Sequence, residues 1–251
     1  MTAADLLAAL DLPDAARVDR RVPKTLLTEH GAPTAADKRW INEGIEQVQW
    51  VAALKPTTVG VAEHRDEARE YLEIAVLHLV LRATAKLARL VELLHRAVPY
   101  PVVALAEQGE RTHLSLAHKR WSQGETGKTV LDGEVVVVDP AAVDAPTRAA
   151  FLSALALGRQ PRGTLFALYQ GWMDTLLALN AARRTNAFAI PDAPDRRAAR
   201  REALGDCARL EADIARLSAA AAKEKQMPRQ VELNLELKRL EAARAAAIER
   251  L

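Results

Sequence analysis

The stretch VPYPVVALAEQGERTHLSLAHKR, Val98 to Arg120, decides the fold because it contains the clearest pair of strands in a helix-rich sequence. Val102 to Ala106 is a short continuous apolar run, and Gln108-Gly109-Glu110 has the composition of a turn. After the turn, Leu114 and Leu116 alternate with more polar neighbours. The pattern predicts a β-hairpin whose first strand is buried on both faces and which forms the spine of a sheet.

Further strands are expected on both sides of this hairpin. Tyr71 to Leu81 (YLEIAVLHLVL) is rich in Ile, Leu and Val and predicts a central strand, and Gly133 to Val138 predicts another. Between the first of these and the hairpin, leucines at helical spacing predict a helix over Thr84 to Arg96.

The N-terminal part is expected to mix short helices with extended segments. Ala4 to Leu10 predicts a short amphipathic helix, and Lys24 to Thr28, which follows a proline, predicts a short strand. Thr34 has the features of an N-cap, and apolar residues then recur at spacings of 4, 3 and 4, so one helix is expected over Thr34 to Leu54. Thr57 to Val61 is expected to be extended.

After Pro140 the sequence is helical in pattern to its end. Thr147 to Leu157 predicts one helix, leucines and Trp172 between Leu165 and Leu179 form the apolar stripe of a second, and Pro191 to Pro194 is the expected linker. The fold class predicted is α+β: a mixed or antiparallel sheet with helices packed on one face, followed by an all-helical C-terminal part. We expect an α+β domain at 1–140, a helical connector at 141–194 and a helical arm at 195–251.

The arm is predicted to be a coiled-coil-like helical hairpin. Apolar residues alternate spacings of 4 and 3 in two seams, separated by a polar segment in which Pro228 fits the first position of a new helix. A long kinked helix that pairs with another chain is the alternative. The residues of the seam expected to dock a partner are Leu210, Ile214, Leu217, Leu233, Leu237 and Leu240.

Composition excludes several classes of protein. The 251 residues contain 35 Lys plus Arg against 33 Asp plus Glu, so the net charge of +2 predicts neither a polyanion partner nor a membrane surface. The single cysteine, Cys207, cannot form an internal disulfide, which favours a reducing, cytoplasmic location. Met1 to Leu12 lacks the features of a secretory signal, and no stretch approaches the about 20 apolar residues of a membrane span.

One segment imitates a phosphate-binding loop. Ser122-Gln-Gly-Glu-Thr-Gly-Lys-Thr129 matches that motif except for its first glycine. Such a loop must open a helix whose N-terminus faces the phosphate, whereas Thr129 leads through Asp132-Gly133 directly into a predicted strand. We therefore expect a turn between two strands, without ATP binding and without a cofactor.

Catalysis is the minority interpretation. The histidines show no zinc-hydrolase spacing, and no Gly-x-Ser-x-Gly motif occurs. A metal-dependent nuclease needs clustered carboxylates near a lysine, and Glu63, Glu70 and Glu73 are the candidates for such a divergent site. No catalytic, cofactor-binding or metal-binding residue is assigned.

Two local basic clusters are candidate nucleic-acid contacts. They lack neighbouring aromatic residues, so any DNA binding would be independent of sequence and would weaken with salt. The clusters consist of Arg196, Arg197, Arg200 and Arg201 at the start of the arm, and of Lys223, Lys225 and Arg229 at the expected hairpin tip.

Several segments together resemble an uncharacterised bacterial family, the domain-of-unknown-function family 4391. They span nearly the whole chain and are Arg21-Val-Pro-Lys24, Ile45-Glu-Gln-Val-Gln-Trp50 with Leu54-Lys-Pro56, Val98-Pro-Tyr-Pro101, Leu168-Tyr-Gln-Gly-Trp172, and Lys223-Glu-Lys-Gln226 with Val231-Glu-Leu-Asn234.

The resemblance implies a partner rather than a reaction. Members of the family are often encoded beside helicases, nucleases and DNA methyltransferases in restriction-like or phage-defence neighbourhoods. The chain is therefore expected to be a non-catalytic adaptor that docks a helicase or another DNA-acting subunit. The alternatives are a nuclease and a sequence-independent DNA-binding subunit.

Overall fold

A computed structural model of the chain describes residues 1–125 and 127–251. The chain forms two compact units, Met1–Leu179 and Asn180–Leu251. This division differs from the three segments expected from the sequence, because residues 141–179 belong to the same unit as the sheet. The boundary falls inside one long helix, α7 (Leu165–Thr185).

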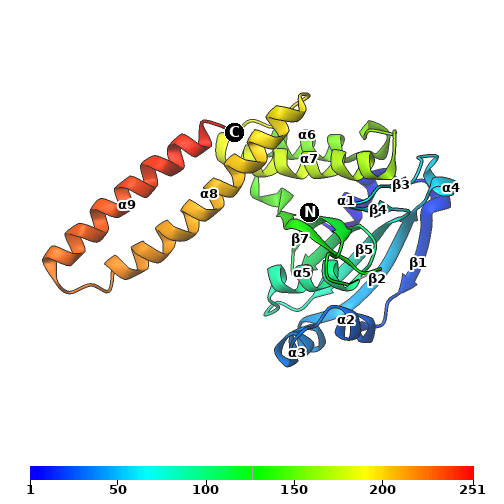
Figure 1. Cartoon of the computed structure of the whole chain (residues 1–251), viewed down its shortest axis with the longest axis horizontal. Coiled ribbons are helices and arrows are strands. Elements are labelled where there is room, and N and C mark those ends of the chain that lie inside the picture. The colour runs from blue at the N-terminus through cyan, green and yellow to red at the C-terminus, as the bar shows by residue number, and fades with distance from the viewer. Residues whose placement is uncertain (126) are drawn as a thin grey trace. The chain divides into compact units, whose positions relative to one another are not determined.

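The first unit contains a six-stranded mixed sheet (Figure 1), as predicted. β5 and β6 are parallel and are joined by helix α5 (Leu87–Ala97), whereas the other neighbouring strands are antiparallel. A separate pair of two-residue strands, β3 (His64–Arg65) and β4 (Glu70–Tyr71), lies outside this sheet. In spatial order the sheet contains β1 (Arg17–Arg21), β2 (Ile45–Leu54), β5 (Ile74–Leu81), β6 (Val102–Gln108), β7 (Arg111–Trp121) and β8 (Thr129–Val138).

The predicted hairpin is confirmed as β6 and β7, with Val103 opposite Leu116 and Gln108 opposite Arg111. Gly109 occupies the turn with a φ of 62°, a conformation that glycine adopts without steric cost. Val102 to Ala106 are all buried, as expected for a strand that is covered on both faces.

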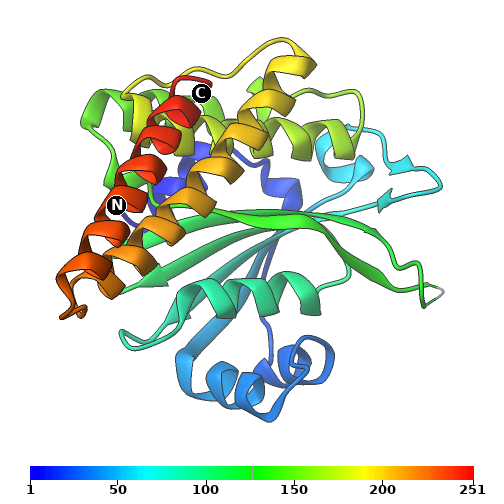
Figure 2. The same ribbon diagram turned by 60° about the vertical axis from the view of Figure 1, so that its left-hand side comes forward.

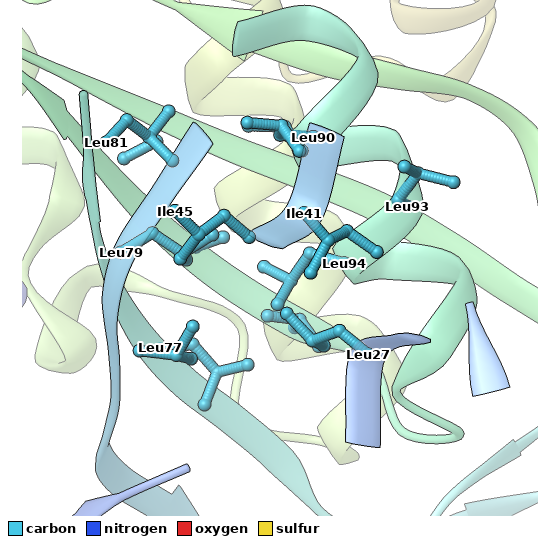
Figure 3. Packing of buried hydrophobic residues seen from close by; sticks show 14 of the residues in the cluster. Leu27, Ile41, Ile45, Leu77, Leu79, Leu81, Leu90, Leu93 and Leu94 are labelled. Carbon is cyan, nitrogen blue, oxygen red and sulfur yellow. The ribbon is translucent and has the colours of Figure 1, made fainter. Parts of the chain in front are cut away.

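One face of the sheet is covered by α5 together with α2 (Lys24–His30) and α3 (Ala35–Gly44). Figure 3 shows the leucine and isoleucine side chains of these helices packed against those of β2 and β5. The residues labelled there are Leu27, Ile41, Ile45, Leu77, Leu79, Leu81, Leu90, Leu93 and Leu94.

The other face is covered by α1 (Ala3–Leu10), α6 (Ala145–Leu155) and the first part of α7. Figure 2 shows α5 on one side of the sheet and these helices on the opposite side. The expectation of helices on one face only was therefore wrong. A strand such as β6, which is apolar at every position, needs cover on both faces.

Two short segments expected to be extended are helical. Lys24 to Thr28 lies in α2, where Leu27 is buried in the core. Of the segment Thr57 to Val61, residues 57–59 lie in the one-turn helix α4 (Pro56–Val59), and Gly60 and Val61 follow it. Both segments directly follow or begin with a proline, which fits the start of a helix as well as an extended segment. The short 3₁₀ helices are Asp14–Ala16, Pro140–Ala142 and Leu157–Arg159.

The expected helix over Thr34 to Leu54 is wrong in its second half, because α3 ends at Gly44 and β2 follows immediately. β2 carries register shifts between Ile45 and Gln47 and between Trp50 and Ala52. Each irregularity adds a residue to the alternation of a strand. The buried residues of β2 therefore recur at spacings that resemble those of a helix.

A hydroxyl from α7 completes the hydrogen bonding of the sheet at Ala117. The register between β6 and β7 ends with Val103 opposite Leu116, one residue short of Val102 and Ala117. The Tyr169 hydroxyl accepts a bond from the Ala117 N–H at 2.9 Å and lies 2.7 Å from the Val102 carbonyl, to which it donates. Tyr169 therefore replaces a strand partner in the interior of the protein.

The second unit contains the predicted helical hairpin, formed by α8 (Pro194–Ala221) and α9 (Met227–Ile248). Figure 1 shows the two helices side by side and antiparallel. The Arg250–Asp206 and Arg244–Glu211 ion pairs connect them, with N–O distances of 2.5 and 3.2 Å.

Candidate functional site

The predicted docking seam lies between the two helices of the arm. Its six leucine and isoleucine side chains are half-buried and recur on one face of each helix. The ion pairs between α8 and α9 lie beside this seam, so its apolar surface is used within the hairpin. Docking by these residues stays a prediction. The residues are Leu210, Ile214 and Leu217 of α8 and Leu233, Leu237 and Leu240 of α9.

The opposite face of α9 exposes large apolar side chains that the sequence prediction missed. Met227, Val231 and Leu235 have exposed fractions of 73%, 55% and 56%. They are spaced four residues apart and therefore form a stripe on the side of the helix that points away from the seam. We call these three residues the outward stripe. Their regular spacing is the only signal in the sequence that could have identified them.

Three exposed lysines lie near the outward stripe. Lys223 and Lys225 precede it, and Lys238 lies one turn beyond Leu235 on the same face. Within the described chain these lysine side chains form no ion pair, whereas Arg229 pairs with Glu232 at 2.6 Å. The stripe is therefore apolar with positively charged margins.

Two of the four arginines in the basic cluster at the start of α8 bind backbone carbonyls, and the other two are exposed. Arg197 donates to the carbonyls of Pro191 and Asp192, and Arg200 donates to Leu251 and Ala189. These bonds hold the segment before α8 and the end of the chain against the helix. Arg196 and Arg201, the other members of the cluster, are exposed.

A carboxylate bridge connects three helices of the second unit. Glu211 of α8 accepts hydrogen bonds from Arg184 at the end of α7 and from Arg244 of α9. Partial burial acts to raise the pKa of Glu211, but the two guanidinium groups outweigh it and hold the pKa below its usual value. The bridge therefore stabilises the arm at neutral pH.

The three candidate nuclease carboxylates do not share one environment. Glu63 is exposed, Glu70 pairs with Arg65 at 2.7 Å, and Glu73 pairs with Lys55 at 3.0 Å. Among residues 1–125 and 127–251 no group of three or more His, Cys, Asp or Glu side chains could hold a metal ion. The nuclease alternative stays a prediction.

A buried polar network in the first unit was not identified from the sequence. The Tyr71 hydroxyl lies 2.6 Å from His118 Nδ1, and burial raises the pKa of Tyr71 above its usual value. On the other face, Lys119 Nζ donates to the carbonyls of His95 and Val98 at the end of α5. Polar residues in an otherwise buried strand are the only hint of this network in the sequence.

The segment that imitates a phosphate-binding loop connects β7 to β8, and Thr129 begins β8 rather than a helix. Lys128 forms an ion pair with Glu125 at 3.0 Å. Thr126, also part of the motif, lies outside the described residues. Across the described ranges, no helix is long and apolar enough to cross a membrane.

The comparison with protein families identifies the chain. A family model described as a domain of unknown function, DUF4391, matches residues 10–243. The chain belongs to the DUF4391 family. Neither the curated proteins nor the solved structures contain a match to this DUF4391 member. The resemblance read from the sequence motifs is thereby confirmed.

The sequence motifs of this DUF4391 member have structural roles in the first unit. Lys24 donates to the carbonyls of Asn42 and Ile45 and so caps the end of α3. In the α7 motif, Tyr169 binds the sheet, and Trp172 Nε1 donates to the Leu155 carbonyl of α6 at 2.8 Å. These motif residues therefore have structural roles, in packing and hydrogen bonding.

Proposed function

We propose that this protein is a non-catalytic adaptor that docks a helicase or another DNA-acting subunit of a bacterial defence system. The observation that carries the proposal is the outward stripe of α9, because large apolar side chains in a row on one helix face mark a surface for another protein. The genes beside which DUF4391 members are often encoded suggest the class of partner.

The apolar side chains of the outward stripe and the lysines beside it indicate what kind of partner surface the stripe binds. An amphipathic helix of the partner can bury its apolar face on Met227, Val231 and Leu235. Lys225 and Lys238 at the margins favour acidic residues beside that apolar face. The partner segment is therefore a helix with an apolar face and acidic flanks.

Charge inserted into the stripe tests this proposal. Leu235→Glu places a carboxylate in the proposed interface, and the affinity for a helicase partner should fall at least about tenfold, which corresponds to about 1.4 kcal/mol. Binding is measured by calorimetry with both purified proteins, using the full chain.

Ala243→Glu is the matched control, because it adds the same charge at an exposed position of α9 outside the stripe. Equal loss of affinity in both variants, or none in either, would contradict docking through this face. Metal-dependent cleavage of DNA by the purified chain would contradict a non-catalytic role.

A second proposal is that the arm also contacts DNA without sequence preference. It is supported by exposed cationic side chains at both ends of α8, namely Arg196, Arg201, Lys223 and Lys225. The two pairs are about 40 Å apart along the helix, given its rise of about 1.5 Å per residue. They would therefore contact separate phosphates rather than form one patch.

A further inference from the structure

The first unit contains a cavity of about 590 Å³, which lies in the size range of sites for small molecules. Its walls come from the end of α2 and the loop that follows, the last turn of α5, the end of β7 and the start of β8. These segments are far apart in the sequence. One of them, Ser122 to Thr129, is the segment that imitates a phosphate-binding loop, and it contributes Ser122, Gln123, Lys128 and Thr129 to the lining.

The wall formed by α2 and α5 is held in place by close packing. A Cβ atom added at Gly31 would lie 2.6 Å from both Ala97 Cβ and the Leu93 carbonyl oxygen. Only a glycine therefore allows the end of α2 to approach α5 this closely. The cavity is bounded by a fixed contact between two helices, which favours a preformed site.

Three basic side chains from separate elements line the cavity. Arg96 belongs to α5, Arg120 to β7, and Lys128 to the segment before β8, whereas Glu29 is the single carboxylate in the lining. His30 also lines the cavity. The charges that face the cavity are therefore mostly positive.

Each of the three cations lies within 4 Å of a carboxylate that does not line the cavity. Glu92 contacts Arg96 at 2.7 Å, Asp132 lies 3.8 Å from Arg120, and Glu125 contacts Lys128 at 3.0 Å. Arg96 Nη2 contacts Glu92, and Arg120 Nη1 donates to the Trp121 carbonyl at 3.1 Å, whereas each guanidinium group carries five N–H donors. These contacts use only part of the donors of the two guanidinium groups and leave the others for a ligand.

The end of α5 would normally oppose an anion here, because carbonyl groups at a helix C-terminus carry partial negative charge. Lys119 Nζ binds the carbonyls of His95 and Val98, and the Thr129 hydroxyl donates to the Pro99 carbonyl at 3.0 Å. The carbonyls of His95, Val98 and Pro99 are therefore already hydrogen-bonded, and a buried cation offsets part of the charge of the helix end.

From this arrangement we infer that the cavity binds the phosphate group of a small molecule of nucleotide size. Planar guanidinium groups bind phosphate oxygens in pairs, and Arg96, Arg120 and Lys128 supply donors from different directions. The mode differs from that of an ATPase loop, since side chains rather than the backbone of a loop would hold the phosphate. The site lies in a different unit from the outward stripe and does not depend on the adaptor proposal.

Titration calorimetry on the full chain tests the site with AMP, adenosine and a 5′-phosphorylated dinucleotide. AMP should bind saturably and adenosine should not, because the phosphate supplies the affinity. AMP represents a free nucleotide, and the dinucleotide represents the 5′-phosphorylated end of a nucleic-acid strand. The ligand that binds more tightly identifies which of the two supplies the phosphate, and either result supports the site.

Arg96→Gln and Arg120→Gln should each weaken AMP binding about tenfold or more, the equivalent of one charge-assisted hydrogen bond. Arg65→Gln is the control, because Arg65 is an exposed arginine paired with Glu70 outside the cavity. Circular dichroism confirms that each variant is folded. Absence of saturable binding up to roughly 10 mM, equal binding of adenosine, or unchanged binding in both variants would overturn the inference.

Discussion

Individual polar residues fix the interior of the first unit at points where the backbone has no partner. Tyr169 supplies a hydroxyl where β6 and β7 meet, and Lys119 supplies an ammonium group where α5 ends. Both side chains are at most 1% exposed. At such positions the loss of one donor leaves buried carbonyl groups without a hydrogen-bond partner, because neither water nor another side chain can replace it.

Replacement of Tyr169 by Phe should destabilise the protein by about 2–4 kcal/mol, because the Ala117 N–H and the Val102 carbonyl would both lose their partner. The free energy of unfolding, measured with urea and followed by fluorescence, checks this value. Tyr100→Phe is the control, since Tyr100 is 43% exposed. A Tyr169→Phe protein as stable as this control would show that the sheet does not need the hydroxyl.

Lys119 should make stability increase with pH in the alkaline range. Burial lowers the pKa of Lys119 from 10.5 to about 8, so between these values the unfolded chain binds a proton that the folded chain has released. The free energy of unfolding should therefore rise between pH 8 and 10.5, by at most about 3 kcal/mol. A neutral amine keeps two N–H groups and can still serve both carbonyls.

The Lys119→Met variant isolates this effect, because methionine has no titratable group. Unfolding is measured at pH 8 and at pH 10 in both proteins. The wild-type protein should gain stability relative to the variant over this interval, whereas parallel pH profiles would show that Lys119 stays charged.

At the scale of elements, two helical glycines should respond in opposite ways to the same substitution. A Cβ atom at Gly171 in α7 would lie 2.5 Å from Pro161 Cδ and 2.7 Å from Gln160 Oε1. At Gly205 in α8 it would meet no described atom within 4 Å. Gly171→Ala should therefore destabilise by about 1–3 kcal/mol, and Gly205→Ala should stabilise by about 0.5–1 kcal/mol.

Thermal unfolding of both glycine variants, monitored by circular dichroism, measures the two effects under identical conditions. Stabilisation by Gly171→Ala would mean that α7 does not pack tightly on the segment before it. Destabilisation by Gly205→Ala would mean that this face of α8 is covered.

The sequence predicted elements well where one periodicity dominated. The continuous apolar run of β6 and the heptad spacing of α8 gave the right elements because burial follows a single pattern there. β2 was missed because its two register shifts give buried residues a helix-like spacing. In α2 one buried residue, Leu27, is too little signal to separate a helix from a strand.

At the scale of the whole molecule, DNA binding by the arm should follow the number of exposed cations. Contacts from Arg196, Arg201, Lys223 and Lys225 would give a plot of log affinity against log salt with a slope no steeper than roughly −4. Fluorescence anisotropy with two unrelated duplexes at several salt concentrations measures this slope. Binding that is insensitive to salt, or that prefers one duplex, would contradict the proposed contacts.

The candidate sites were less predictable than the fold because they depend on which faces remain open. The seam of the arm could be read from spacing, but its use between α8 and α9 depends on the pairing of the two helices. The outward stripe could have been found from the spacing of Met227, Val231 and Leu235 once that pairing was known. The cavity could not, since it exists only after four distant segments meet.

The bond between Tyr169 and Ala117 has a consequence for the order in which the protein is made. Tyr169 lies 52 residues after Ala117, so the hairpin leaves the ribosome well before the residue that completes its hydrogen bonds. Until α7 has been translated, the Ala117 N–H and the Val102 carbonyl at the start of β6 lack this hydroxyl as a partner. Completion of the sheet therefore waits for the C-terminal third of the chain, which makes truncated products prone to recognition by chaperones.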